Sequence, residues 1–183
     1  RVKKVYLLES FSNQKLLDLI NKNDIEKIFL NRNQLDNLVD GNHQGIVALV
    51  KEISPISLET LINKNKENKR NILIMLDGLK DPHNLGSIIR TAETAGVHGI
   101  IIPKRRAASV NATVNKTSAG AVEHMKIARV TNISDSIQKL KDAGLWICGT
   151  DINTQTYYYN QDLTGPLGIV IGNEGSKKSE KVR

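Results

Sequence analysis

Asn84 and Arg90 lie six residues apart in one short stretch, and side chains of these types at that spacing could bind an anion. Apolar residues recur at helical spacing from Leu85 to Ala95, so we expect a helix that begins near Asn84, a preferred N-cap type. Arg90 falls on the side away from the apolar stripe, and Gly86, one turn earlier, leaves its path toward the helix start clear. Unpaired N–H groups there already favour an anion. The alternative is an ordinary cap beside a solvated arginine, since arginine is usually exposed.

Two later turns follow apolar runs and could hold a ligand. The first contains Thr150 and Asp151, and the second contains Glu174 between Gly172 and Gly175. Open parallel sheets bind ligands at the carboxyl ends of their strands, and glycine lets a backbone approach a ligand closely. Taken alone, each turn is equally compatible with an ordinary connection from a strand to a helix.

Four blocks of the sequence resemble, in order, the motifs of the SpoU (TrmH-like) RNA ribose 2′-O-methyltransferases. The first motif is matched by Asp81–Gly86 with Ile89–Ala92, the joining segment by Asn111–Glu123, a strand end by Gly149–Thr150, and the second motif by Gly172–Gly175. The likeness covers roughly residues 43–183. Four ordered blocks are far more specific than one short motif.

The resemblance implies methyl transfer from S-adenosylmethionine to a ribose 2′-hydroxyl, an in-line displacement in which the hydroxyl loses its proton. The catalytic residues that it implies are Asn84, Arg90 and Glu174, and the cofactor-binding residues are Thr150, Ile171 and Gly172. A guanidinium stays protonated, so we interpret Arg90 as a phosphate clamp that favours the developing alkoxide. Asn84 would orient the ribose or Arg90, and Glu174 would hold these groups or the substrate in place.

Members of this family act as homodimers and complete a trefoil knot with a third motif. The sequence ends at Arg183, inside the helix expected after the second motif. We therefore expect a methyltransferase domain truncated before the third motif, with weak cofactor binding. The chain also opens directly in an early strand, without the helix that normally precedes it in the N-terminal domain of such proteins.

The elements that position these residues alternate between strands and helices. We expect strands at 71–77, 99–102, 126–130, 145–149 and 167–171, and helices at 84–96, 110–117 and 133–143. This order predicts an α/β fold with a parallel sheet, which the resemblance identifies as SPOUT-type. The loop after the first strand lacks the glycines of a G-x-G-x-x-G turn, and no P-loop is present, so a dinucleotide-binding unit is disfavoured.

The chain divides, by its sequence, into three parts. Residues 1–52 form a small α/β unit, and His43-Gln44-Gly45 resembles the end of the substrate-binding domain, similar to a ribosomal-protein RNA-binding fold, in the ribosomal-RNA branch of the family. Residues 53–70 are interpreted as a polar linker with one short helix, and residues 71–183 as the methyltransferase domain.

The composition favours RNA as the partner. The 26 Lys and Arg against 19 Asp and Glu give a net charge of +7, which suits a polyanion, although a lysine-rich surface can also serve solubility alone. Aromatic residues make up 4% of the chain, so base stacking is expected to be minor. The four histidines share no metal-ligand spacing, and no membrane span or signal peptide is evident. A single cysteine, Cys148, fits a reducing cytoplasm.

Three functions remain open at this stage. The N-terminal unit favours 2′-O-methylation of a ribose, by resemblance a guanosine, in large-subunit ribosomal RNA. Methylation of a transfer-RNA ribose would use the same chemistry. A non-catalytic RNA-binding protein of the same fold is the third possibility, although the presence of Asn84, Arg90 and Glu174 together argues against it.

Overall fold

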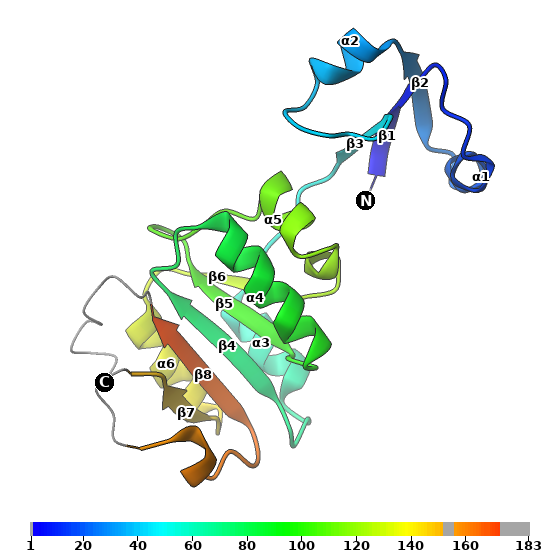
Figure 1. The fold of residues 1–183 in the computed structure, drawn as a ribbon. Coiled ribbons are helices and arrows are strands. Elements are labelled where there is room, and N and C mark those ends of the chain that lie inside the picture. Colours follow the sequence, from blue (N-terminus) through cyan, green and yellow to red (C-terminus); the bar gives the residue numbers. More distant parts are fainter. Residues whose placement is uncertain (1, 152–155, 173–183) are drawn as a thin grey trace. The chain divides into compact units, whose positions relative to one another are not determined.

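A computed structural model of the chain describes residues 2–151 and 156–172. The chain forms two compact units, Arg1–Glu52 and Ile53–Arg183 (Figure 1). Each unit has its own sheet and its own apolar core, so each is described separately below.

The first unit is a three-stranded sheet with two helices. Its elements are β1 (Val2–Leu8), α1 (Gln14–Lys22), β2 (Glu26–Leu30), α2 (Arg32–Asp36) and β3 (Ile46–Val50). In the strand order β2-β1-β3, β1 runs parallel to β2 and antiparallel to β3. A small core of Val5, Leu7 and Ile20 joins β1 to α1.

The second unit contains five strands in the order β6-β5-β4-β8-β7, and every pair is parallel, as the sequence predicts. The strands are β4 (Ile72–Asp77), β5 (Gly99–Pro103), β6 (Ile127–Val130), β7 (Trp146–Gly149) and β8 (Leu167–Gly172). The helical elements are α3 (Leu58–Asn65), α4 (Pro82–Thr94), α5 (Ala112–Thr117), α6 (Ile133–Asp142) and the 3₁₀ turns η1 (Ala121–Glu123) and η2 (Tyr158–Asn160).

Helices cover both faces of this sheet, which explains the continuous apolar run of β4. Ile74 and Leu76 face a core that α4, α5 and η1 complete, whereas Leu73 and Met75 face a second core built with α3 and α6 (Figure 1). Because successive side chains of a strand point to opposite faces, this alternation assigns α4 and α6 to opposite sides of the sheet.

The segment 53–70 contains the one short helix that the sequence predicts, but this helix is packed into the second unit instead of lying in a free linker. The helix is α3, which Ser57 caps by accepting a hydrogen bond from the Thr60 backbone N–H at 3.0 Å. Leu58 and Leu61 of this helix are buried in the α6-side core. The two leucines lie three residues apart on one helical face, and burying that face makes the segment part of the second unit.

Candidate functional site

Helix α4 begins earlier than the sequence analysis expects. Its N-cap is Asp81, whose carboxylate accepts a hydrogen bond from the His83 backbone N–H at 2.9 Å, and Pro82 occupies the first turn. The expected N-cap, Asn84, is instead the third helical residue. Proline is well suited to the first turn because its missing N–H has no helical partner there, so Pro82 helps to start the helix.

Gly86 has a different role from the one its position suggests. It is buried, and a Cβ atom at this residue would overlap the Thr117 side chain and crowd the Ser118 backbone nitrogen at 3.1 Å. Gly86 therefore lets the end of α5 lie directly against α4. The absence of its side chain serves helix packing, not the path of the Arg90 side chain.

Arg90 lies on the exposed side of α4, opposite Leu85 and Ile89, which are buried in the core. Its guanidinium has no hydrogen-bond or ion-pair partner among the residues that the structure describes. It lines a hollow of about 500 Å³, here called the α4 hollow, with Ser87, Thr91, Thr94, Ala95 and Thr117. An unpaired cation beside hydroxyl groups can bind a phosphate oxygen.

Asn84 is also exposed, but the helix does not bring it next to Arg90. Six residues along an α-helix correspond to a rise of about 9 Å, and two side chains at that spacing point about 120° apart around the helix axis. The two side chains can therefore contact different parts of one extended ligand. Glu174, the third predicted catalytic residue, lies outside the described residues.

The predicted cofactor residues do meet, at the carboxyl edge of the sheet. The Thr150 backbone N–H donates to the Val170 carbonyl at 3.0 Å, which joins the end of β7 to β8. On the other side of β8, its last residues Ile171 and Gly172 lie beside Leu76 and Asp77 of β4. Parallel strands present their carboxyl ends at one edge, so these residues share the place where α/β sheets bind ligands.

Thr150 and Asp151 line a hollow of about 490 Å³ along the outer strand, here called the β7 hollow. The segment after the 152–155 gap forms its other wall, and the remaining lining residues are Trp146, Ile147, Cys148, Gly149, Thr156, Tyr157, Tyr158 and Gln161. This volume lies within the range of small-molecule sites in proteins.

Aromatic side chains gather at the β7 hollow in a way that the composition conceals. Of the seven aromatic residues in the chain, Trp146, Tyr157 and Tyr158 line this hollow, and Tyr159 packs against the two tyrosines. Tyr157 and Tyr159 stack with ring centroids 5.2 Å apart, and all four are exposed. The run of three consecutive tyrosines at 157–159 is the feature of the sequence that could have predicted this cluster. The low aromatic content therefore understates the local capacity for stacking against a planar ligand.

The α4 hollow and the β7 hollow have no lining residue in common. One chain thus presents a free cation at the first and an open strand end with aromatic side chains at the second. Within the described part of the chain, no group of three or more His, Cys, Asp and Glu side chains could hold a metal ion. No helix there combines the length and apolar character of a membrane span.

Comparison with known proteins gives these two regions a context. Residues 71–183 match the family model "SpoU rRNA Methylase family", and residues 1–56 match "RNA 2'-O ribose methyltransferase substrate binding". The Bacillus subtilis protein YacO, whose name assigns it to the TrmH family of tRNA/rRNA methyltransferases, is 42% identical over 171 residues, which cover 93% of this chain and 69% of YacO.

Solved structures show the same fold. The SpoU methyltransferase AviRb from Streptomyces viridochromogenes superimposes with a TM-score of 0.81 at 22% identity, covering 100% of this chain and 69% of AviRb. An rRNA methyltransferase from Sinorhizobium meliloti gives a TM-score of 0.78 at 22% identity, covering 99% of this chain and 67% of that protein. Both alignments extend over the two units.

Proposed function

This chain belongs to the SpoU rRNA methylase family of RNA 2′-O-ribose methyltransferases, and from that premise we propose that it methylates a guanosine ribose in large-subunit ribosomal RNA with S-adenosylmethionine as methyl donor. The observation that carries the proposal is the presence, in one chain, of two features. Arg90 on α4 has no partner among the described residues, and the carboxyl edge of the sheet is open at Thr150 and Gly172. Together they supply an anion clamp and a place for a nucleoside-like cofactor.

The β7 hollow fits S-adenosylmethionine in size and in chemistry. Thr150 follows β7 and is joined to β8 through the Val170 carbonyl, so the hollow lies at the carboxyl end of a parallel strand, where such sheets bind ligands. Gly149 and Gly172 present no side chains at this edge. Exposed aromatic rings on the opposite wall suit a planar adenine ring. Thr150, which lines this hollow, would hold the cofactor together with Ile171 and Gly172 at the end of the neighbouring strand β8, chiefly through backbone groups.

The chemistry that the bound cofactor supplies is an electrophilic methyl group on a sulfonium. The protein must align the ribose 2′-oxygen with that methyl and lower the cost of the oxygen's developing negative charge. The Arg90 guanidinium would bind the neighbouring RNA phosphate and hold the ribose in place. The 2′-hydroxyl proton would pass to a phosphate oxygen, because the guanidinium remains protonated and cannot accept it.

We propose further that the working enzyme is a homodimer. Arg90 and Thr150 line separate hollows in one chain, yet methyl transfer requires the substrate clamp and the methyl donor to meet. A second copy could deliver its α4 hollow to the β7 hollow of the first. Each catalytic site would then take Arg90 from one subunit and the cofactor residues from the other.

Subunit mixing tests this arrangement. Arg90→Ala and Gly172→Val should each be inactive alone. After subunit exchange, half the dimers are mixed and one of their two sites is intact, so activity should return to about a quarter of the wild-type value. No recovery, with mixed dimers shown to be present by a tag on one variant, would contradict a shared site.

The reaction itself is tested with tritiated S-adenosylmethionine and total RNA, using the complete open reading frame. We expect label in large ribosomal RNA, and mapping of the 2′-O-methyl group should identify a guanosine. Label confined to transfer RNA would overturn the proposed substrate and keep the reaction type. No transfer to any RNA by the folded, cofactor-bound protein would overturn the enzymatic proposal.

A further inference from the structure

The first unit contains a hollow of about 590 Å³ beside a loop of residues 41–45, here called the His43 loop. This hollow is separate from both hollows of the second unit. Its lining is mostly polar, with one aromatic ring, and consists of Leu8, Ser10, Phe11, Ser12, Asn13, Arg32, Asp36, Gly41, Asn42, His43, Gln44 and Gly45. The size is suitable for a small ligand or for one residue of a polymer.

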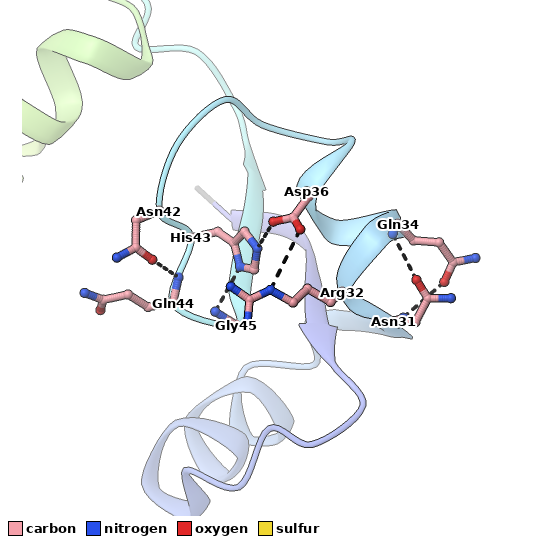
Figure 2. Close-up of polar contacts among 8 residues, drawn as sticks. All are labelled: Asn31, Arg32, Gln34, Asp36, Asn42, His43, Gln44 and Gly45. Atoms are coloured by element: carbon pink, nitrogen blue, oxygen red, sulfur yellow. Dashed lines mark hydrogen bonds and ion pairs between the residues drawn. The ribbon is translucent and has the colours of Figure 1, made fainter.

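The His43 loop is held in place by its own side chains. The His43 Nδ1 atom accepts a hydrogen bond from the Gly45 backbone N–H at 2.9 Å, so its Nε2 carries the proton and donates to Asp36 Oδ1 at 2.8 Å (Figure 2). The His43 side chain is only 8% exposed. Asn42 Oδ1 accepts from the Gln44 backbone N–H at 3.1 Å. The loop is thus tied to α2 before any ligand binds.

Several polar groups around the hollow have few or no partners among the residues that the structure describes. The Gln44 side-chain amide and the Asn42 Nδ2 group make no hydrogen bond among the described residues. The Arg32 guanidinium has one distant contact, from Nε to Asp36 Oδ2 at 3.9 Å, and its side chain is 81% exposed. Figure 2 shows the Arg32 guanidinium beside His43 and Gly45, and the Asn42 and Gln44 amides close together on the same loop.

These groups match the chemistry of a single unstacked nucleotide. Amide side chains can donate to and accept from a base edge, an arginine binds a phosphate, and an aromatic ring such as Phe11 can stack on a base. A preformed loop also lowers the ordering cost of binding. Two amides without a partner in the described residues, and a guanidinium whose contact with Asp36 is 3.9 Å long, thus lie beside one hollow.

We propose that the hollow of the His43 loop binds one unstacked nucleotide of the RNA substrate, with Arg32 on its phosphate and the Asn42 and Gln44 amides on its base. The identity of the ligand as RNA rests on the proposed function. The site lies in the first unit and shares no lining residue with the α4 hollow or the β7 hollow. The domain would therefore select RNA by the presence of an unpaired residue.

Binding measurements on the full chain test this proposal without a methyl donor. The probe is a fluorescein-labelled 12-nucleotide RNA of random sequence, followed by fluorescence anisotropy. Arg32→Ala should weaken binding roughly fivefold or more, because a charge-assisted contact to phosphate is lost. Lys15→Ala is the matched control: it removes one positive charge from an exposed residue of the same unit that lies outside the hollow. It should change the affinity less than twofold.

Gln44→Gly separates a binding role from a structural one. Gln44 has φ of +50°, a conformation that side chains other than glycine rarely adopt. Glycine relieves that constraint, so the melting temperature should stay the same or rise while RNA affinity falls severalfold. Unchanged affinity for Gln44→Gly, or equal losses for Arg32→Ala and Lys15→Ala, would overturn the proposal.

Crosslinking locates the nucleotide directly. RNA that contains 4-thiouridine should crosslink on irradiation to a peptide that includes the His43 loop, and a fully paired duplex should not. Crosslinks confined to the second unit, or captured equally by the duplex, would overturn the site. These readouts do not require methyl transfer, so an inactive protein that still crosslinks here would contradict only the proposed function.

Discussion

The His43 loop and helix α4 obtain their rigidity in opposite ways. In the loop, polar side chains hold the backbone: His43 bridges Gly45 and Asp36, and Asn42 holds Gln44. In α4, buried Leu85 and Ile89 fix the helix on the sheet, and the exposed Arg90 guanidinium has no partner among the described residues. Removing His43, which holds the loop, should therefore affect folding and binding together, whereas removing Arg90 should affect function alone.

The largest effect is expected for Arg90→Ala, which sharpens this contrast. Methyl transfer should fall by about a hundredfold or more, because stabilisation of the developing charge is lost. The melting temperature and the cofactor affinity should remain close to wild type, since the guanidinium has no partner within the described part of the chain. The measurement combines tritium transfer with thermal unfolding and calorimetry. Near-normal turnover would remove Arg90 from the mechanism.

Gly86→Ala tests the packing of α5 against α4. The added methyl group overlaps Thr117, so we expect a loss of about 1–3 kcal/mol in unfolding free energy, as in other overpacked sites. Denaturant unfolding measures it. The double variant Gly86→Ala with Thr117→Ala should recover part of the loss, because the overlapping hydroxyl is removed. Full stability of the single variant would mean that α5 can move away at little cost.

His43→Ala tests the polar contacts that hold the His43 loop. The Gly45 N–H loses its partner, and Asp36 keeps only its distant contact with Arg32, which should cost about 1–2 kcal/mol of unfolding free energy. RNA affinity should fall as well. Arg90→Ala, by contrast, should leave the stability unchanged. The matched control is His83→Ala, because His83 is an exposed residue of α4 whose side chain has no hydrogen bond within the described ranges. Equal unfolding free energies for the two variants would contradict the role of His43 in holding the loop.

The smallest effect is expected at an exposed ion pair of the second unit, Glu59 on α3 with Lys139 on α6, 2.7 Å apart. The hydrogen bond from Lys139 lowers the pKa of Glu59, and Glu59 raises the pKa of Lys139. The stabilisation is therefore present above the ordinary pKa of a glutamate and is lost as the pH falls through the lowered value. The difference in melting temperature between wild type and Glu59→Gln should be small at neutral pH and should vanish in acid or high salt. A large difference that persists in acid would contradict this assignment.

Much of the second unit could be predicted because its signals are local. The apolar run of β4 and the spacing of Leu85, Ile89 and Ala92 each follow from a short window of sequence, and alternating elements imply parallel strands. The start of α4 differs from the prediction because Asp81 and Asn84 are both good caps. Proline at the first helical position resolves the choice in favour of Asp81.

The candidate site was less predictable than the fold. The sequence could mark Thr150, Ile171 and Gly172 as residues at strand ends, but only the pairing of β8 between β4 and β7 brings them to one edge. The aromatic cluster at the β7 hollow was invisible to composition, because a percentage does not record where side chains gather. The composition of segment 53–70 indicates a linker because its charged residues outnumber the two leucines that anchor it in the core.

By itself, the sequence determined the class of fold, the order of the motifs and the identity of the residues that could do chemistry. Those features depend on periodicity and on residue types within a few positions of one another. Only the tertiary structure decided that Gly86 admits Thr117, that His43 is tied to Asp36, and that Arg90 and Thr150 line separate hollows. Each of these depends on close packing between elements, and packing distances are not encoded in any local pattern.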